Sequence, residues 1–381
     1  MVTQARTDVV VIGGGPAGLA AALAARLGGH QVCVVDRGTS PIDKACGEGL
    51  MPDAVAALRR LGVDLHDGHG RPFRGIHFLD GKYAAAAHFP GELGLGIRRE
   101  KLHQILVNRA LAAGVGIMWR TKATAIEPQG VRVDGRLLNC RWIIGADGVN
   151  SSCRRWAGIQ ARRRTGHRLG IRQHFAVTPW TDMVEVHWAD GEQAYVTPVS
   201  LDEICVVLLG RVRSLRFSEL GKRFPRLAER LKSAKPTDAV RGAITGTIRL
   251  ERVTWGNVAL VGDASAGIDA VTGDGLALGF RQAVALGEAL RQERLSLYEA
   301  SHHQICRAPF LMARLLLLLD GHDRLREIAL QALASRPQIF DGLLAAHVGA
   351  RHPARASLDV AALGVRLLSL AVAPRSWSLA P

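Results

Sequence analysis

The chain has 381 residues, 48% of them hydrophobic and 42 of them glycine, and its formal net charge at pH 7 is +15. This composition suits a large α/β enzyme that divides into two subdomains. Residues 1–8 are polar and no run of about 18 uncharged apolar residues occurs, so we expect neither a secretory signal nor a transmembrane helix, and a cytoplasmic protein.

The positive charge and the cysteines exclude further classes. The arginines are scattered without any nucleic-acid motif, so we expect no nucleic-acid partner. An anionic cofactor or an anionic membrane surface explains part of the excess charge. The six cysteines form no CxxC pair and lack the spacing of metal ligands, so we expect reduced thiols and no metal site.

The chain opens on a strand, a glycine-rich turn and a helix. Residues 9–12 are β-formers, residues 13–18 read G-G-G-P-A-G, and residues 19–27 have an Ala/Leu-rich helical pattern. A second apolar run over 31–35 ends at Asp36. This order of strand, turn, helix, strand and acid is the dinucleotide-binding fingerprint in its required context.

Each residue type in the fingerprint has a physical reason. Gly13 permits the tight turn, Gly15 lets the backbone approach a pyrophosphate, and Gly18 lets the helix pack close to the strand. The helix N-terminus offers free N–H groups to phosphates. Asp36 is placed to accept hydrogen bonds from a ribose.

Further elements follow in chain order. We expect helices at 52–60, 101–113, 217–232 and 275–291, helical structure over 297–350, and one short helix at 358–372. We expect strands within 73–89 and at 116–119, 123–126, 130–133, 141–145, 170–176, 183–189, 193–198, 204–211, 240–250 and 256–263. The β-rich part favours a separate sheet inserted into the nucleotide domain. The expected domains are a discontinuous nucleotide domain (1–70, 98–165 and 251–300), a substrate domain (71–97 and 166–250), and a C-terminal helical region with its tail (301–381).

Three motifs stand in register: residues 13–18, G-A-D-G-V-N-S at 145–151, and V-G-D-A-S-A-G at 261–267. Their order resembles the flavoprotein superfamily of group A aromatic hydroxylases, flavin-dependent halogenases and geranylgeranyl reductases, over about residues 5–300. The resemblance implies an α/β fold with a Rossmann-like FAD-binding domain of the glutathione reductase and p-hydroxybenzoate hydroxylase type. It also implies an inserted, mostly antiparallel β-sheet substrate domain, a C-terminal helical segment, FAD as cofactor, and NAD(P)H or another reductant as transient electron donor.

The resemblance also assigns roles within the FAD site. Asp36 would bind the adenosine ribose, Arg99 would contact FAD from a helix start, Ala123 would lie beside the adenine, Asp147 would shape the loop near the pyrophosphate, and Asp263 would bind the ribityl chain. The residues expected to bind FAD are Gly13, Gly15, Pro16, Ala17, Gly18, Asp36, Arg37, Cys46, Gly47, Arg99, Ala123, Asp147, Gly262, Asp263, Gly273, Asp274, Gly275 and Leu276.

A physical argument, separate from the resemblance, also predicts that residues 270–276 form a loop facing the flavin. A helix begins just after Gly273 and Gly275, so its N–H groups and dipole would stabilise negative charge on the pyrimidine edge of a reduced flavin. The alternative is an ordinary glycine-capped helix start. Thr272 lies in this loop and is a candidate catalytic residue.

Cys46 is the second candidate catalytic residue. The segment K-A-C-G-E-G-L-M-P at 44–52 is similar to the reductase branch, in which a cysteine lies near the flavin. Cys46 is therefore either a redox or gating residue beside the isoalloxazine, or a small packing residue in a flavin-contacting loop.

The sequence gives fewer signals for the residues that bind the substrate. We expect His174, Trp188, Tyr195 and Pro198 to line a pocket that faces the flavin. Strand alternation would place Trp188 and Val186 on one face and His187 on the other.

Most superfamily members with this layout are NAD(P)H-dependent monooxygenases. We therefore put first the hydroxylation or epoxidation of a hydrophobic aromatic, polyketide or isoprenoid molecule through a flavin C4a-hydroperoxide. The T-G-D-G at 272–275 approaches the reductases' T-G-E-G, so reduction of prenyl C=C bonds is the main alternative. A halogenase is disfavoured because its tryptophan motif is absent, and a flavin-binding sensor is the non-enzyme alternative.

The C-terminal helices either cover the core or form an apolar lip. In the second case the lip would bind a hydrophobic substrate or contact a membrane surface, with Arg314, Arg324 and Arg326 facing anionic headgroups.

Overall fold

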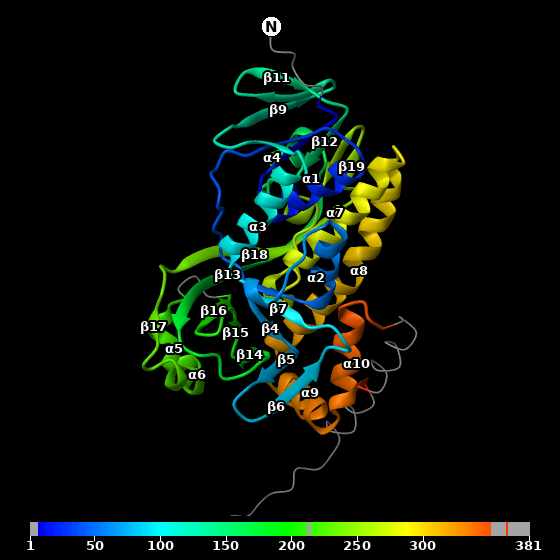
Figure 1. Ribbon diagram of the computed structural model, residues 1–381. Helices are drawn as coiled ribbons and strands as arrows, with labels where there is room; N and C mark the ends of the chain where they lie inside the picture. The colour runs from blue at the N-terminus through cyan, green and yellow to red at the C-terminus, as the bar shows by residue number, and fades with distance from the viewer. Residues whose placement is uncertain (1–6, 212–214, 352–362, 365–381) are drawn as a thin grey trace, which may run out of the picture.

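The computed structural model describes residues 7–211, 215–351 and 363–364 (Figure 1). The helix expected at 358–372 lies outside the described residues except at 363 and 364, which are helical.

A six-stranded sheet forms the core of the N-terminal part, in the order β19-β20-β12-β1-β2-β8. Neighbouring strands are parallel except β19 and β20. All four residues of β1 are buried, as expected for the central strand of a parallel sheet. The strands are β1 (Val9–Ile12), β2 (Val32–Val35), β8 (Gly116–Met118), β12 (Trp142–Gly145), β19 (Thr254–Trp255) and β20 (Val258–Leu260).

Helix α1 (Pro16–Leu27) leaves the glycine turn and packs against both α3 (Arg99–Ala112) and α7 (Gly275–Arg291). Small residues allow the close approach, since a Cβ on Gly287 would lie 2.8 Å from the Cβ of Ala24. The short α4 (Ser152–Trp156) follows β12, and the antiparallel β9 (Ala123–Glu127), β10 (Gly130–Val133) and β11 (Arg136–Asn139) cap one end of the molecule (Figure 1). The fold class expected from the sequence is confirmed.

A large second sheet has the order β17-β13-β16-β15-β14-β5-β6, and β18 pairs with β13. It is antiparallel except for the parallel pair of β14 and β5. Its strands are β5 (Gly75–Leu79), β6 (Ala84–His88), β13 (Ala161–Ala176), β14 (Val184–Ala189), β15 (Glu192–Pro198), β16 (Glu203–Gly210), β17 (Lys235–Pro236) and β18 (Arg241–Leu250). A small sheet of β3 (Gly49–Leu50), β7 (Gly94–Gly96) and β4 (Arg71–Phe73) adjoins it.

Strand β13 runs across the domain boundary that we expected between residues 165 and 166, with an irregular register between Thr165 and Arg168. The domain boundaries therefore stay a prediction. The single helix expected at 217–232 is wrong. The chain forms a 3-10 turn and two short helices, α5 (Leu220–Arg223) and α6 (Pro225–Arg230), because Pro225 disfavours helical backbone at the residue before it.

The C-terminal helices are α8 (Leu295–Asp320), α9 (Asp323–Ser335) and α10 (Pro337–His347), as the apolar pattern predicted, while α2 (Pro52–Arg60) packs against α7. Helices α9 and α10 cover β6 (Figure 1). No helix within the described ranges has the length and hydropathy needed to span a bilayer.

Only part of the expected membrane-facing lip is at the surface. Leu311, Leu315 and Leu318 are exposed. The placement of Arg326 on that surface is wrong, because its side chain is buried and pairs with Asp323 at 2.9 Å.

Tyr298 of α8 anchors the helix to the parallel sheet. Its hydroxyl donates to the carbonyl oxygen of Leu260 at 2.6 Å, and the residue is fully buried. We expect Tyr298→Phe to lower the free energy of unfolding by about 1–2 kcal/mol, because a buried acceptor loses its donor. Urea unfolding measures this. Tyr83→Phe, at a half-buried tyrosine, should change stability by less than about 0.5 kcal/mol, and equal effects would contradict the account.

Candidate functional site

The glycines of the first turn have two different reasons to be glycine. Gly13 has φ +117°, and a Cβ there would lie 2.4 Å from the carbonyl oxygen of Ala146; a Cβ on Gly18 would lie 1.9 Å from that of Gly13. Both are required by packing. A Cβ on Gly15 would meet no atom of the described residues within 4 Å. Gly15 therefore faces open space at the N-terminus of α1, where a pyrophosphate would fit.

Asp36 lies at the end of β2 beside this turn. One carboxylate oxygen accepts the N–H of Gly14 and the other accepts the N–H of Gly38, both at 2.6 Å. The carboxylate is thereby fixed in place, and its oxygens keep lone pairs for further donors such as ribose hydroxyls. Pro16 and Ala17 open α1, and Arg37 is exposed next to Asp36.

Asp147, expected near the pyrophosphate, lies beside the same turn. The backbone nitrogen of Asp147 lies 3.0 Å from the position of a Cβ on Gly13, so the 145–148 loop adjoins the turn. The Asp147 carboxylate accepts the N–H groups of Ser152 and Cys153 at the start of α4. Ala123 is half-buried at the start of β9.

Arg99 and Asp263 leave polar groups available for a ligand. The Nε of Arg99 is buried and has no hydrogen-bond partner among the described residues. Asp263 is exposed in a 3-10 turn whose first residue, Gly262, has φ +58° and donates its N–H to Gln282. The unpaired buried Nε of Arg99 and the open glycines are what a bound FAD would complete, so the residues present fit this cofactor.

The loop at the start of α7 is exposed at its glycines. Gly273 has φ +72°, and a Cβ on Gly273 or Gly275 would meet no atom of the described residues within 4 Å. Asp274 is instead buried, with its carboxylate turned toward His347 of α10 rather than toward the open side. Leu276 is half-buried.

Buried charges hold the other end of this loop. Arg168 of β13 lies 3.5 Å from the Asp269 carboxylate and 3.6 Å from that of Asp320 at the end of α8. Burial raises the pKa of Asp269, and the neighbouring Arg168 opposes the rise. The hydroxyl of Tyr195 donates to the carbonyl oxygen of Val271 at 2.7 Å.

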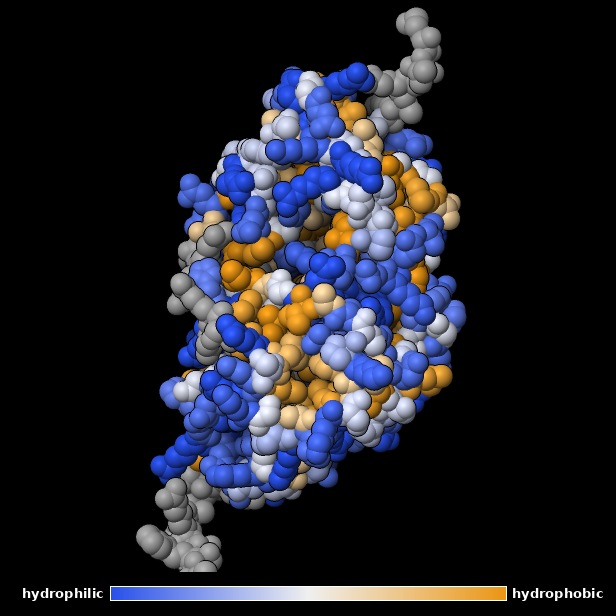
Figure 2. All heavy atoms as spheres, turned by 90° about the vertical axis from the view of Figure 1, so that its left-hand side faces the viewer, coloured by the Kyte–Doolittle hydropathy of each residue, from blue (hydrophilic) through white to orange (hydrophobic). Residues whose placement is uncertain are grey.

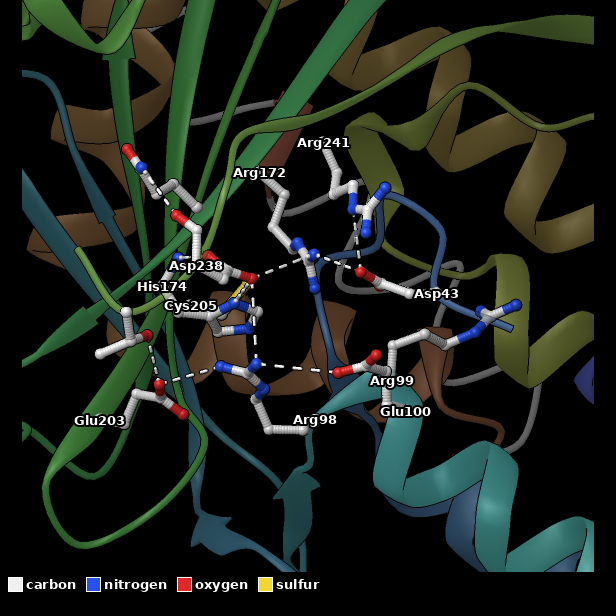
Figure 3. Close-up of polar contacts among 12 residues, drawn as sticks. Asp43, Arg98, Arg99, Glu100, Arg172, His174, Glu203, Cys205, Asp238 and Arg241 are labelled. Atoms are coloured by element: carbon white, nitrogen blue, oxygen red, sulfur yellow. Dashed lines mark hydrogen bonds and ion pairs between the residues drawn. The ribbon is translucent and has the colours of Figure 1, made fainter. Parts of the chain in front are cut away.

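Figure 3 shows part of a second group of charges, with Asp43, Arg172, His174 and Asp238 labelled. We call Asp43, Glu48, Arg172, His174 and Asp238 the buried charge cluster. Arg172 lies 3.0 Å from Glu48, 3.2 Å from Asp43 and 3.3 Å from Asp238. His174 bridges two carboxylates, with Nε2 2.6 Å from Glu48 and Nδ1 2.8 Å from Asp238. The cluster binds the loop of residues 43–48 to the inserted sheet.

Glu48 is the centre of the cluster. It is 1% exposed, and it adopts φ 60°, a left-handed conformation that is uncommon for residues other than glycine. Its Oε1 also accepts the N–H of Arg99 at 2.9 Å, so Glu48 stabilises the start of α3. Two ion pairs continue the cluster outward, from Arg241 to Asp43 and from Arg98 to Glu203.

Cys46 lies in this loop and is half-buried. Its sulfur accepts the N–H of Glu48 at 3.4 Å, and its carbonyl oxygen accepts the thiol of Cys205 at 3.7 Å. Burial raises the pKa of Cys205 well above its ordinary value, so that thiol stays protonated. Gly47 next to Cys46 is exposed, and a Cβ there would meet no described atom within 4 Å.

Ligand atoms of Glu48, His174 and Cys205 lie within 4.8 Å of one another, which is the spacing of a metal site. The chemistry opposes a cation, because Glu48 and His174 already pair with each other and Arg172 contributes a positive charge beside them. The three side chains are better explained as part of the charge cluster.

The four expected pocket residues do not form one group in the structure, although Trp188 and Tyr195 lie against the same hydrophobic cluster. His174 is in the charge cluster, Tyr195 contacts the 270–276 loop, and Pro198 ends β15 with its carbonyl oxygen against Gly96. Trp188 and Val186 share one hydrophobic cluster with α8, as the alternation predicted, and His187 is outside it. Their contact with a substrate stays a prediction.

Figure 2 shows a hollow near the middle of one face, with hydrophobic atoms gathered around it. A groove of about 710 Å³ lies along β4, and exposed Leu93 and Leu201 contribute to its lining.

The sequence reasoning missed Asp43, Glu48, Arg98, Arg168, Arg172, Asp238, Asp269 and His347. Each is an ordinary charged residue in its local segment. Their partners lie up to 198 residues away in the chain, so no local pattern marks them.

A parallel sheet with a glycine turn, an acid after the second strand and an inserted antiparallel sheet defines an FAD-dependent flavoprotein. The sequence profile of the family described as "FAD binding domain" matches residues 6–295, and the chain belongs to this family.

The relatives are flavoenzymes with different reactions. The chain is 28% identical over 324 residues to menaquinone reductase of Mycobacterium tuberculosis, covering 76% of this chain and 78% of that protein. It is 28% identical over 333 residues to 6-methylpretetramide 4-monooxygenase of Streptomyces rimosus (77% and 78%). It is 27% identical over 306 residues to digeranylgeranylglycerophospholipid reductase of Methanothrix thermoacetophila (75% and 78%).

Solved structures agree on the fold. A flavoprotein/dehydrogenase from Cytophaga hutchinsonii superposes with a TM-score of 0.78 at 19% identity, covering 90% of this chain and 92% of that one. The protein is therefore an FAD-dependent oxidoreductase.

The glycine turn gives a direct test of FAD binding. Gly15→Ala should fold normally, because its Cβ meets no described atom, yet weaken FAD binding at least about tenfold by filling the space for the pyrophosphate. Gly18→Ala should instead destabilise the fold itself, because its Cβ would overlap the Gly13 carbonyl. Flavin fluorescence titration and thermal unfolding separate the two effects. Unchanged FAD affinity in Gly15→Ala would refute the placement of the pyrophosphate.

The buried charge cluster gives a matched pair, since Arg172 and Arg241 both contact Asp43. Arg172→Met should lower the free energy of unfolding by about 3–5 kcal/mol, because it leaves buried carboxylates without their partner. Arg241 is 55% exposed, so Arg241→Met should cost less than about 1 kcal/mol. Urea unfolding of both variants tests this. Similar losses of unfolding free energy in the two variants would show that burial does not determine how much each arginine stabilises the fold.

Proposed function

We propose that this flavoprotein reduces carbon–carbon double bonds of an isoprenoid chain. The observation that carries the proposal is the placement of Cys46, a half-buried thiol on a loop that buried charges hold rigidly against the inserted sheet. The thiol proton has no acceptor among the described residues, and the neighbouring Gly47 leaves open space.

The chemistry that FAD would supply, once bound and reduced by NAD(P)H or another donor, is a hydride for one carbon of the double bond. Cys46 Sγ would supply a proton to the second carbon, so that two C–H bonds form as the π bond breaks. The thiolate is then reprotonated from solvent. The N-terminus of α7 would stabilise the negative charge of the reduced cofactor through its N–H groups.

Two relatives support this choice. One is named for menaquinone and the other for digeranylgeranylglycerophospholipid. The Lys44–Gly47 and Thr272–Gly275 segments are the two places where this sequence approaches the reductase pattern. We therefore place reduction ahead of the monooxygenation that the motif layout alone favoured. The hydrophobic substrates of the relatives suit an isoprenoid.

Monooxygenation is the second candidate. The strand with Tyr195 and Pro198 is nearer to the hydroxylase pattern, and Tyr195 contacts the 270–276 loop directly. The Streptomyces monooxygenase is as similar as the menaquinone reductase. Halogenation has less support, because the tryptophan motif of the halogenases is absent from the sequence.

The test is turnover under anaerobic conditions with dithionite-reduced protein and a geranylgeranyl lipid as the substrate. We expect consumption of one double bond per reduced FAD, detected as a mass increase of two hydrogens. Turnover that requires oxygen and adds an oxygen atom would overturn the proposal and support the second candidate.

The role of Cys46 is tested separately. Cys46→Ala should lower turnover at least about a hundredfold with FAD still bound, because the proton donor is lost. Cys140→Ala is the control, at a half-buried cysteine outside this loop. Equal turnover in Cys46→Ala and wild type would show that Cys46 is a packing residue and not the proton donor.

A further inference from the structure

The last residue of α10 reaches the start of α7. His347 Nε2 lies 2.9 Å from Asp274 Oδ1, across 73 residues of sequence. Both side chains are almost fully buried, at 7% and 5% exposed. The C-terminal helical region thus touches the same loop that carries Gly273 and Gly275.

Two further charges complete this contact. Arg281 of α7 lies 3.4 Å from Asp53 at the start of α2, and both act electrostatically on His347. Three buried atoms here have no hydrogen-bond partner among the described residues: Asp53 Oδ1, Asp274 Oδ2 and His347 Nδ1. Two carboxylates and two cations from α2, α7 and α10 therefore meet in one buried place that the proposed reaction does not use.

We propose that His347 is a positioning residue of the flavin site, which holds the 270–276 loop in place through the Asp274 carboxylate. Glycines on both sides of Asp274 give this segment unusual backbone freedom. The beginning of the loop is already fixed by Asp269 with Arg168 and by Val271 with Tyr195. His347 supplies the fixed point at the end of the loop, where α7 begins.

The contact depends on pH. Burial lowers the pKa of His347, but the carboxylates of Asp274 and Asp53 outweigh burial and Arg281, so its pKa lies above the ordinary value. Burial also raises the pKa of Asp53, to about 6. Because the folded pKa of His347 is raised, its stabilising charge is fully present below the unfolded pKa of about 6.5 and is lost as the pH rises through the folded value.

The experiment measures the rate of FAD release by flavin fluorescence from pH 6 to 10, with hydrogen exchange of residues 269–276 in the FAD-free protein. In wild type, release should accelerate as His347 loses its proton. H347Q should release FAD about tenfold faster at pH 7, exchange faster in this loop, and lose the alkaline acceleration. D274N should behave in the same way.

H88Q is the matched control, because His88 of β6 also faces an aspartate of α10, Asp341, in an exposed pair. It should release FAD as wild type does. The inference is overturned if H347Q matches H88Q in release and exchange, or if wild-type release does not change with pH; the latter measurement needs no variant to fold. Neither result depends on the proposed reduction, which the anaerobic assay tests alone.

Discussion

The structure around the flavin site depends on the burial of one carboxylate, that of Glu48. Removing an ion from water is expensive, so a buried carboxylate persists only where several partners replace its hydration. Here an arginine and a histidine of β13 and a backbone N–H at the start of α3 supply these partners, and all three lie far from Glu48 in the sequence. The cost of burial makes the arrangement specific, because a loop shift that breaks one contact leaves a charge unpaired.

The same principle applies on the opposite side of the site. Asp269 and Asp320 share Arg168, and Asp274 has His347. The segments expected to contact the flavin are loops, and loops are mobile unless a rigid framework holds them. In this protein, strands of the inserted sheet and ends of C-terminal helices hold them through buried charges, while glycines keep the cofactor side free of side chains.

How much of this the sequence could predict depends on the range of the interactions. The first strand, turn and helix were predicted because their signals lie within about 30 residues, in the alternation of glycines and apolar runs. The helix expected at 217–232 was wrong because Pro225 outweighed the apolar pattern. Glu48 and Arg172 were missed because a charge that is paired across the fold has the same local pattern as a solvated one. Tyr195 was selected for its residue type, and only the fold showed which loop it contacts.

The parallel pairing of β5 with β14 has a consequence for how the chain assembles. Residues 76–79 and 184–187 are neighbours in the large sheet, yet α3, two strands of the parallel sheet (β8 and β12) and the antiparallel β9, β10 and β11 are synthesised between them. Closing such a long loop is slow, because entropy is lost before the contact forms. The edge of β5 that pairs with β14 therefore stays unpaired until β14 has been synthesised. Until then the nascent protein presents an open strand on which a neighbouring nascent chain could pair, and early occupation of the nucleotide site would not close it.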